Sequence, residues 1–239
     1  MKPAVRLAAL MELPVKYIWT HDAFRVGEDG PTHQPIEQEA QIRLMEHLKN
    51  HSGANSMLVL RPADVTETTI AWKMALENKS TPTALILSRQ NIKDLPSETN
   101  NRFEDSVKST KGAYIVEDCI GTPDIILVAS GSEVASLVEA SVLLKNDNLK
   151  VRIVSAPSEG LFRNQSVDYK LSVIPSGVPV FGLTAGLSVT LQGLVGPGGT
   201  VFGLNSFGHS APYETLDKKF GFTADNVYMK VKDYLSKMD

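Results

Sequence analysis

Short apolar runs alternate along the first part of the chain with stretches in which apolar residues recur every three or four positions. The strand-like runs occupy residues 15–19, 57–60 and 83–87. The intervening stretches have the spacing of one helix face, with apolar residues at Ile36, Ala40, Leu44, Met45 and Leu48 and then at Ile70, Ala71, Met74 and Ala75. Asp64, with Glu67 three residues later, resembles a capping box at the start of the second helix. Strands that alternate with helices predict a parallel α/β sheet.

The second part of the chain repeats this alternation. Residues 125–129 are apolar on both faces, which predicts a fully buried parallel strand. Further strand-like runs occupy residues 151–154, 178–183 and 201–204. We expect one helix to begin at Gly131 and Ser132 and a last helix to be capped by Thr223. Their inward residues are expected to be Val134, Leu137, Val138 and Leu144 in the first helix and Val227, Val231, Leu235 and Met238 in the second.

These two parts are separated by a polar stretch that shows no sustained hydrophobic period. It contains Pro96 and many Ser, Thr and Asn residues, which is typical of a linker. We therefore predict an α/β protein with two consecutive doubly wound, mostly parallel-sheet domains. The expected domains are residues 1–95 and 123–239, and the expected linker is residues 96–122.

Composition and charge narrow the class of protein. The chain has 239 residues, of which 42% are hydrophobic and 21% charged, as in ordinary globular proteins. A net charge of −3 argues against nucleic acid as a partner. No apolar run is long enough to cross a membrane. The single cysteine, Cys119, excludes an intrachain disulfide, and we expect a cytoplasmic protein.

Polar side chains concentrate in residues 20–35, which we call the polar loop. His21 and Asp22 come directly after the first strand-like run, and Arg89 follows the run at residues 83–87. Ligands of open α/β sheets bind at the carboxyl ends of the strands, and a guanidinium suits phosphate or carboxylate. The pattern therefore predicts a polar ligand site at this edge of the sheet.

Each of these residues also has an interpretation without a ligand. His21 and His33 are equally explained as surface or hydrogen-bonded loop residues, and Arg89 as a structural ion-pair partner. A metal site formed by His21, Asp22, Asp29 and His33 matches no helix or knuckle signature.

Two later motifs are weaker. Residues 207–212 lack the last glycine of a nucleophile elbow, and a helix that begins near Pro212 explains them better. Residues 193–199 lack the spacing of a dinucleotide-binding loop and indicate a turn, and Cys119 has no base beside it in sequence.

Longer motifs resemble the transketolase family. They are Thr-His-Asp at residues 20–22, Gly-Glu-Asp-Gly-Pro-Thr-His-Gln-Pro at 27–35, Arg-Pro-Ala-Asp at 61–64 and Leu-Ser-Arg-Gln-Asn at 87–91. Residues 129–134 and 220–223 are similar to that family's C-terminal domain. The resemblance covers essentially the whole chain, as the second half of the pyrimidine-binding domain followed by the C-terminal domain.

The resemblance implies a transferase of the pentose phosphate pathway, a homodimer that uses thiamine diphosphate and magnesium to move a two-carbon ketol unit between sugar phosphates. It implies that His21 contacts the substrate near the reacting carbons, as a catalytic residue, and that Asp29 holds a substrate hydroxyl. His33 and Arg89 would bind the phosphate end. The C-terminal domain is expected to serve packing and dimer contacts and to hold no site residue.

Departures from the family pattern limit these expectations. The Gly-Asp-Gly motif that binds the diphosphate and metal is absent, and the chain begins after the family's cofactor-activating glutamate. Arg25 stands where many relatives have glycine, and Thr184 stands where many have glutamate. We therefore expect no cofactor or metal residues here, an inactive isolated chain, and an exposed apolar surface that binds the missing N-terminal portion or a partner subunit.

Two alternatives remain. One is a subunit of a split transketolase, or a noncatalytic interaction module. The other is a related thiamine enzyme, such as a dihydroxyacetone or deoxyxylulose synthase.

Overall fold

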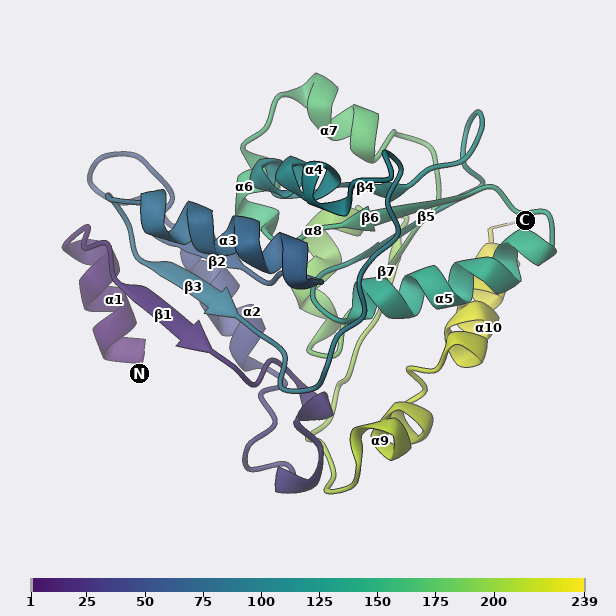
Figure 1. The fold of residues 1–239 in the computed structure, drawn as a ribbon, viewed down its shortest axis with the longest axis horizontal. Helices are drawn as coiled ribbons and strands as arrows, with labels where there is room; N and C mark the ends of the chain where they lie inside the picture. Colours follow the sequence, from purple (N-terminus) through teal and green to yellow (C-terminus); the bar gives the residue numbers. More distant parts are fainter. Residues whose placement is uncertain (1, 239) are drawn as a thin grey trace.

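The computed structural model describes residues 2–238 and contains two sheets, each with helices packed against it (Figure 1). The first sheet has three parallel strands in the order β1-β3-β2, and it defines what we call the first unit. Its strands are β1 (Lys16–Trp19), β2 (Leu58–Leu60) and β3 (Thr83–Ile86). On the central strand, Thr83 lies opposite both Lys16 and Leu58. All three predicted strands are therefore present.

Side chains that alternate along these strands form two apolar layers, one on each face. Val59, Ala84 and Ile86 pack toward α1 (Lys2–Leu10) and α2 (Gln38–Arg43). Leu60 and Leu85 pack toward α3 (Val65–Glu77) on the other face. Figure 1 shows α3 in front of the sheet and α2 behind it. The short 3₁₀ helix η2 (Leu44–Glu46) continues α2.

The predicted cap of α3 is present, with one difference. The Asp64 side chain accepts a hydrogen bond from the backbone N–H of Glu67 (2.8 Å). The Glu67 carboxylate accepts from the N–H of Ala63 (2.8 Å), one residue before the cap. Two otherwise unpaired N–H groups at the helix start are satisfied in this way.

The second sheet defines the second unit and has five strands in the order β4-β6-β5-β7-β8. All neighbours are parallel except β4 and β6, which are antiparallel. The strands are β4 (Tyr114–Glu117), β5 (Ile125–Ala129), β6 (Val151–Ser155), β7 (Val180–Leu183) and β8 (Thr200–Phe202). Every residue of β5 is buried, as its apolar sequence predicts.

Helices cover both faces of this sheet. One face packs against α5 (Glu133–Asn146) and α10 (Ala224–Leu235). The other packs against α6 (Glu159–Arg163), α7 (Val167–Val173) and α8 (Gln192–Val195), with the 3₁₀ helix η4 (Ser188–Leu191) leading into α8. Thr223 caps α10 as predicted. Met238, expected to face inward, is instead 52% exposed because α10 ends before it.

The segment expected to be a linker, residues 96–122, carries regular structure. It contains α4 (Arg102–Val107), the 3₁₀ helix η3 (Lys108–Lys111) and the edge strand β4. The helix is too short to show a hydrophobic period, and it depends on capping by Asn101, whose side chain accepts from the N–H of Glu104. The strand lies at a sheet edge, where alternating exposure leaves only a weak apolar pattern.

Candidate functional site

The polar loop leaves the carboxyl end of β1 and passes through the 3₁₀ helix η1 (Phe24–Asp29). Phe24 is fully buried and holds this loop to the second unit, since its ring packs against Phe220 (5.0 Å between centroids) and Phe222 (4.9 Å). Figure 1 shows the loop beside α9 (Tyr213–Phe220) at the lower end of the molecule. The loop is therefore positioned by both units.

His21 and His33 line one pocket of about 400 Å³. The Nδ1 atom of each ring lies within hydrogen-bond distance of the preceding threonine hydroxyl, 3.0 Å for His21 and 2.9 Å for His33. These contacts occupy Nδ1, so Nε2 is the ring nitrogen through which either side chain would meet a ligand. Further lining residues come from the ends of β1 and β3, from α2 and from the second unit, namely Trp19, Ile86, Gln38, Ile42 and Phe207.

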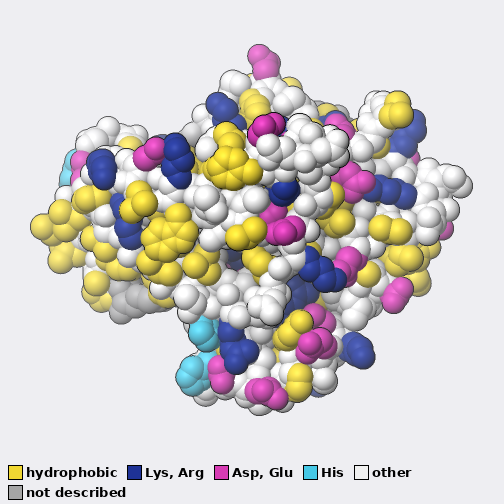
Figure 2. Space-filling model, viewed as in Figure 1, with side chains coloured by type: hydrophobic (Ala, Val, Ile, Leu, Met, Phe, Trp, Pro, Cys, Tyr) yellow, Lys and Arg dark blue, Asp and Glu magenta, His cyan; other side chains and the backbone are white. Residues whose placement is uncertain are grey.

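Asp29 and Arg89 form a loose ion pair, with 3.9 Å between Asp29 Oδ2 and Arg89 Nε. Both side chains are about half exposed, and exposed pairs of this kind contribute little stability. Neither residue is among those that line the histidine pocket. The structure thus brings the predicted residues together as two pairs. His21, His33 and Asp29 come from the polar loop, and Arg89 comes from the segment after β3. Figure 2 shows histidine side chains beside basic and acidic side chains at the lower end of the molecule.

Asp22 also lines the histidine pocket, but its Oδ2 atom belongs to a buried ionic network that the sequence pattern did not predict. Arg61, which is fully buried, donates from Nη2 to Asp22 Oδ2 (2.8 Å) and from Nη1 to Glu133 Oε2 (2.5 Å). Burial opposes the charge of Arg61, but the carboxylates of Glu133, Glu39 and Asp22 outweigh it and hold its pKa well above the ordinary value.

This arginine joins the ends of four strands. It follows β2, and its Nη1 also donates to the carbonyl of Ser130, just after β5 (2.8 Å). The Ser88 hydroxyl, after β3, donates to Asp22, after β1 (3.2 Å). Gly131 has φ of +62°, and a Cβ there would lie 2.6 Å from Arg61 Cζ, so glycine is required on both counts. The site therefore rests on a rigid polar base shared by the two sheets.

Arg25 forms a second bridge between the polar loop and the second unit. Its Nε donates to Asp217 of α9 (2.8 Å), and its Nη1 and Nη2 donate to Glu133 (3.2 Å) and Ser136 (3.1 Å) of α5. Burial raises the pKa of Asp217, although Arg25 counteracts the shift. The sequence marked Arg25 only as a departure from the family pattern, whereas the structure makes it a structural contact.

Residues 207–211, which we call the 207–211 segment, are attached to the polar loop by further hydrogen bonds. The Gln34 amide donates to the carbonyls of Gly27 and His209, both at 2.9 Å, and the Ser210 hydroxyl donates to the carbonyl of Glu28 (2.5 Å). Pro212 precedes α9, as the helix interpretation of residues 207–212 predicts. Phe207 belongs to the second unit, which was expected to hold no site residue.

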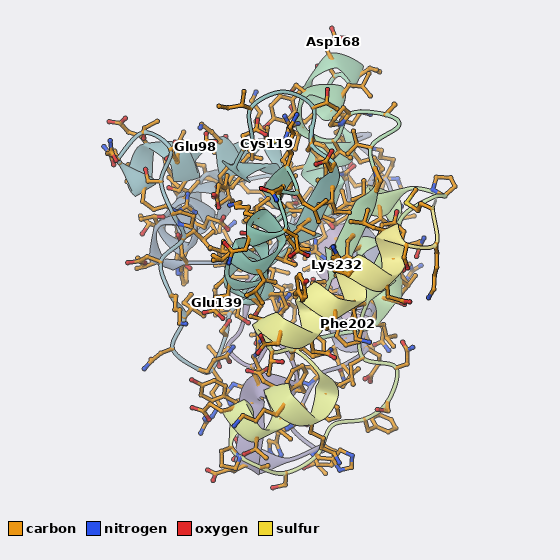
Figure 3. The ribbon with its side chains drawn as sticks, turned by 90° about the vertical axis from the view of Figure 1, so that its right-hand side faces the viewer. Glu98, Cys119, Glu139, Asp168, Phe202 and Lys232 are labelled. Carbon is orange, nitrogen blue, oxygen red and sulfur yellow. The ribbon has the colours of Figure 1, made fainter. Side chains whose placement is uncertain are left out.

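Cys119 lies apart from this site. Figure 3 places it near the top of the molecule, whereas α9 lies at the bottom. Burial and the neighbouring Asp118 carboxylate raise the pKa of the thiol, which disfavours the reactive thiolate.

The described residues do not fit a diphosphate cofactor held by a metal ion. Residues 2–238 contain no group of three or more His, Cys, Asp or Glu side chains placed to bind a metal. The residues lining the histidine pocket include no lysine or arginine that could face a diphosphate. The donors present suit hydroxyl groups instead. None of the helices among these residues combines the length and hydropathy that a membrane span requires.

Comparisons with known proteins identify the family of this chain. Residues 1–94 match the model of the transketolase pyrimidine-binding domain, and residues 112–223 match that of the transketolase-like C-terminal domain. The transketolase of Halalkalibacterium halodurans is 44% identical over 236 residues, which are 98% of this chain and 34% of that protein.

Solved structures give the same result. The transketolase of Pichia stipitis in complex with sedoheptulose 7-phosphate has a TM-score of 0.83 and 37% identity, over 98% of this chain and 32% of that one. A split-gene transketolase, an inactive β4 tetramer, has a TM-score of 0.66 at 24% identity, which shows a shared fold. The chain spans about a third of the length of the full transketolases it matches. It belongs to the transketolase family, a family of thiamine diphosphate enzymes, and corresponds to the C-terminal portion of its members.

Proposed function

We propose that this chain supplies the substrate-binding wall of a transketolase active site, in which a two-carbon ketol unit moves from a ketose phosphate to an aldose. The observation that carries this proposal is the shared pocket of His21 and His33, on the same loop as Asp29, which pairs with Arg89 from the end of β3. These groups hydrogen-bond hydroxyls and pair with phosphate, which a sugar phosphate requires.

The four residues are assigned to different parts of the substrate. We assign His21 to the reacting end of the sugar, Asp29 to a hydroxyl, and His33 with Arg89 to the phosphate. Half-exposed Arg89 lies only 3.9 Å from a carboxylate, so an incoming phosphate would compete with Asp29 for the guanidinium. The described residues offer no site for a diphosphate held by a metal ion, so the role assigned to this chain is to hold and orient the substrate.

The isolated chain is therefore expected to be inactive in a coupled ketol-transfer assay with thiamine diphosphate and Mg²⁺. A chimera in which this chain replaces the matched third of the Halalkalibacterium halodurans transketolase is expected to be active. Robust turnover by the isolated chain would contradict its assigned role, as would a folded but inactive chimera.

Variants of the chimera test the division of the substrate. Arg89→Gln is expected to raise KM for phosphorylated acceptors at least about tenfold, since a charge-assisted contact is lost, and to leave KM for unphosphorylated glycolaldehyde unchanged. His33→Ala should likewise raise KM for phosphorylated acceptors and leave KM for glycolaldehyde unchanged. His21→Ala should instead lower kcat for both acceptors. If His21→Ala raised KM for phosphorylated acceptors and His33→Ala lowered kcat, the assigned roles of the two histidines would be wrong. Lys73→Gln, on the exposed face of α3, is the control.

A second candidate role, as a subunit that pairs with the rest of a transketolase, is favoured by the exposed surface of the first unit. Strand β1 has a neighbour on one side only. Figure 2 shows hydrophobic side chains gathered at the end of the molecule where α1 and β1 lie. Those at least 40% exposed include Leu7, Leu10, Met11, Leu13 and Ile18. Light scattering of the chain with and without the remaining transketolase portion tests this, and a monomer that binds neither itself nor that portion would contradict it.

A further inference from the structure

Phe207 is an aromatic side chain of the second unit that lines the pocket of His21 and His33. It is 73% exposed, whereas Phe222, a nearby aromatic of the same unit, is buried in the core. A large apolar group left exposed at a polar pocket is a candidate contact for a ligand. Its exposure is not explained by packing of the second unit.

The backbone on the C-terminal side of Phe207 is fixed against the polar loop. Gly208 is buried, and a Cβ at this position would lie 1.6 Å from Gln34 Oε1, so no side chain can be accommodated without moving Gln34. The same glutamine donates to the His209 carbonyl, and Ser210 donates to the Glu28 carbonyl. Phe207 is therefore held in register with the loop that carries the two histidines.

The pocket is lined by polar and apolar side chains of the first unit and by Phe207 of the second. Histidine, threonine and glutamine side chains of the polar loop and α2 suit sugar hydroxyls, and Trp19, Ile42 and Ile86 are apolar lining residues of the first unit. An extended sugar phosphate also has an apolar side, made by the C–H groups of its carbon chain. An aromatic ring offers a flat, low-entropy surface for such groups.

We propose that Phe207 is a substrate-contacting residue, whose ring packs against the carbon chain of the sugar phosphate held by the polar loop. This inference rests on the proposed function and extends it to the second unit. It implies that this unit contributes to substrate preference as well as to packing. The ring contacts carbon and not the phosphate. Its removal therefore weakens the binding of sugar phosphates and leaves the binding of inorganic phosphate unchanged.

The test is an NMR titration of the ¹⁵N-labelled full chain with ribose 5-phosphate and, separately, with inorganic phosphate. Phe207→Ala is expected to weaken binding of the sugar phosphate about fivefold and that of inorganic phosphate less than about twofold. Phe207→Tyr keeps the ring and should bind as the unchanged chain does. Phe103→Ala removes a half-exposed phenylalanine of α4 and is the matched control, with no expected effect on either ligand.

Equal binding of ribose 5-phosphate by Phe207→Ala and the unchanged chain would overturn the role of Phe207. Equal weakening of both ligands would also overturn it, because the ring would then act on the phosphate or on the loop. Phe207→Leu, which keeps apolar bulk without a flat ring, replaces the alanine variant if the latter unfolds, and it should give an intermediate loss. An unchanged chain that binds neither ligand contradicts the proposed function instead.

Discussion

At the scale of single residues, the most consequential side chain is Arg61, which is not among the residues that line the histidine pocket. It is fully buried and faces three carboxylates, those of Asp22, Glu133 and Glu39. A buried arginine with carboxylate partners contributes little net stability, because the cost of removing the charges from water offsets their mutual attraction. Removing it has a larger effect, because buried Asp22 would lose its counter-charge, while Glu133 and Glu39 would each keep only one arginine partner.

We expect Arg61→Met to lower the free energy of unfolding by about 3–5 kcal/mol, the cost of breaking a buried ion pair on one side. Urea denaturation followed by circular dichroism measures this change. Lys73→Met is the control, because it removes an exposed pair with Glu77 (2.7 Å), and its cost should stay below about 1 kcal/mol. Equal effects of the two substitutions would show that the buried network is not a structural requirement.

At the scale of elements, the segment between the two family domains is organised by one carboxylate. Asp105 of α4 accepts from the Ser97 hydroxyl (2.7 Å) and from the N–H groups of Glu98 (3.0 Å) and Thr99 (3.3 Å), and Lys108 lies 3.1 Å away. Burial raises the pKa of this carboxyl, but these hydrogen bonds and Lys108 together lower it to about 2.

The pH dependence of stability should report this carboxylate. Its pKa is lower in the folded chain than the ordinary value of 3.8, so its stabilisation is fully present above that value and is lost as the pH falls toward 2. A shift of this size corresponds to about 2 kcal/mol. The difference in unfolding free energy between the unchanged chain and Asp105→Asn should therefore be constant above pH 5 and shrink below it. Asp94→Asn, at an exposed position, is the control, and a difference independent of pH would refute the assignment.

Elements with a strong local pattern could be predicted from the sequence, and elements that depend on distant partners could not. The apolar run of β5 identified that strand to the residue, whereas β4 was missed because an edge strand with half-buried Ile115 and Glu117 has a weak pattern. The polar loop was recognisable from its composition. The contact of Arg61 with Glu133 spans 72 positions, and the exposure of Phe207 depends on a fold that no local window contains.

At the scale of the whole molecule, the two units share one core. Ala23, Phe24 and Ile36 of the first unit belong to the same apolar cluster as β5, α5 and α10 of the second. The Arg61 and Arg25 bridges cross the same boundary. A shared core of this kind makes the units unfold together, because neither can open without exposing the apolar surface and charges of the other.

Cooperativity between the units can be measured without labels, because both tryptophans, Trp19 and Trp72, belong to the first unit. Tryptophan fluorescence therefore reports the first unit, and far-ultraviolet circular dichroism reports mainly the larger second one. We expect the two urea transitions of the unchanged chain to coincide. Phe24→Ala removes the fully buried ring between the units and should shift the fluorescence transition to lower urea than the dichroism transition. Separate transitions in the unchanged chain, or coincident ones in the variant, would show that Phe24 does not couple the units.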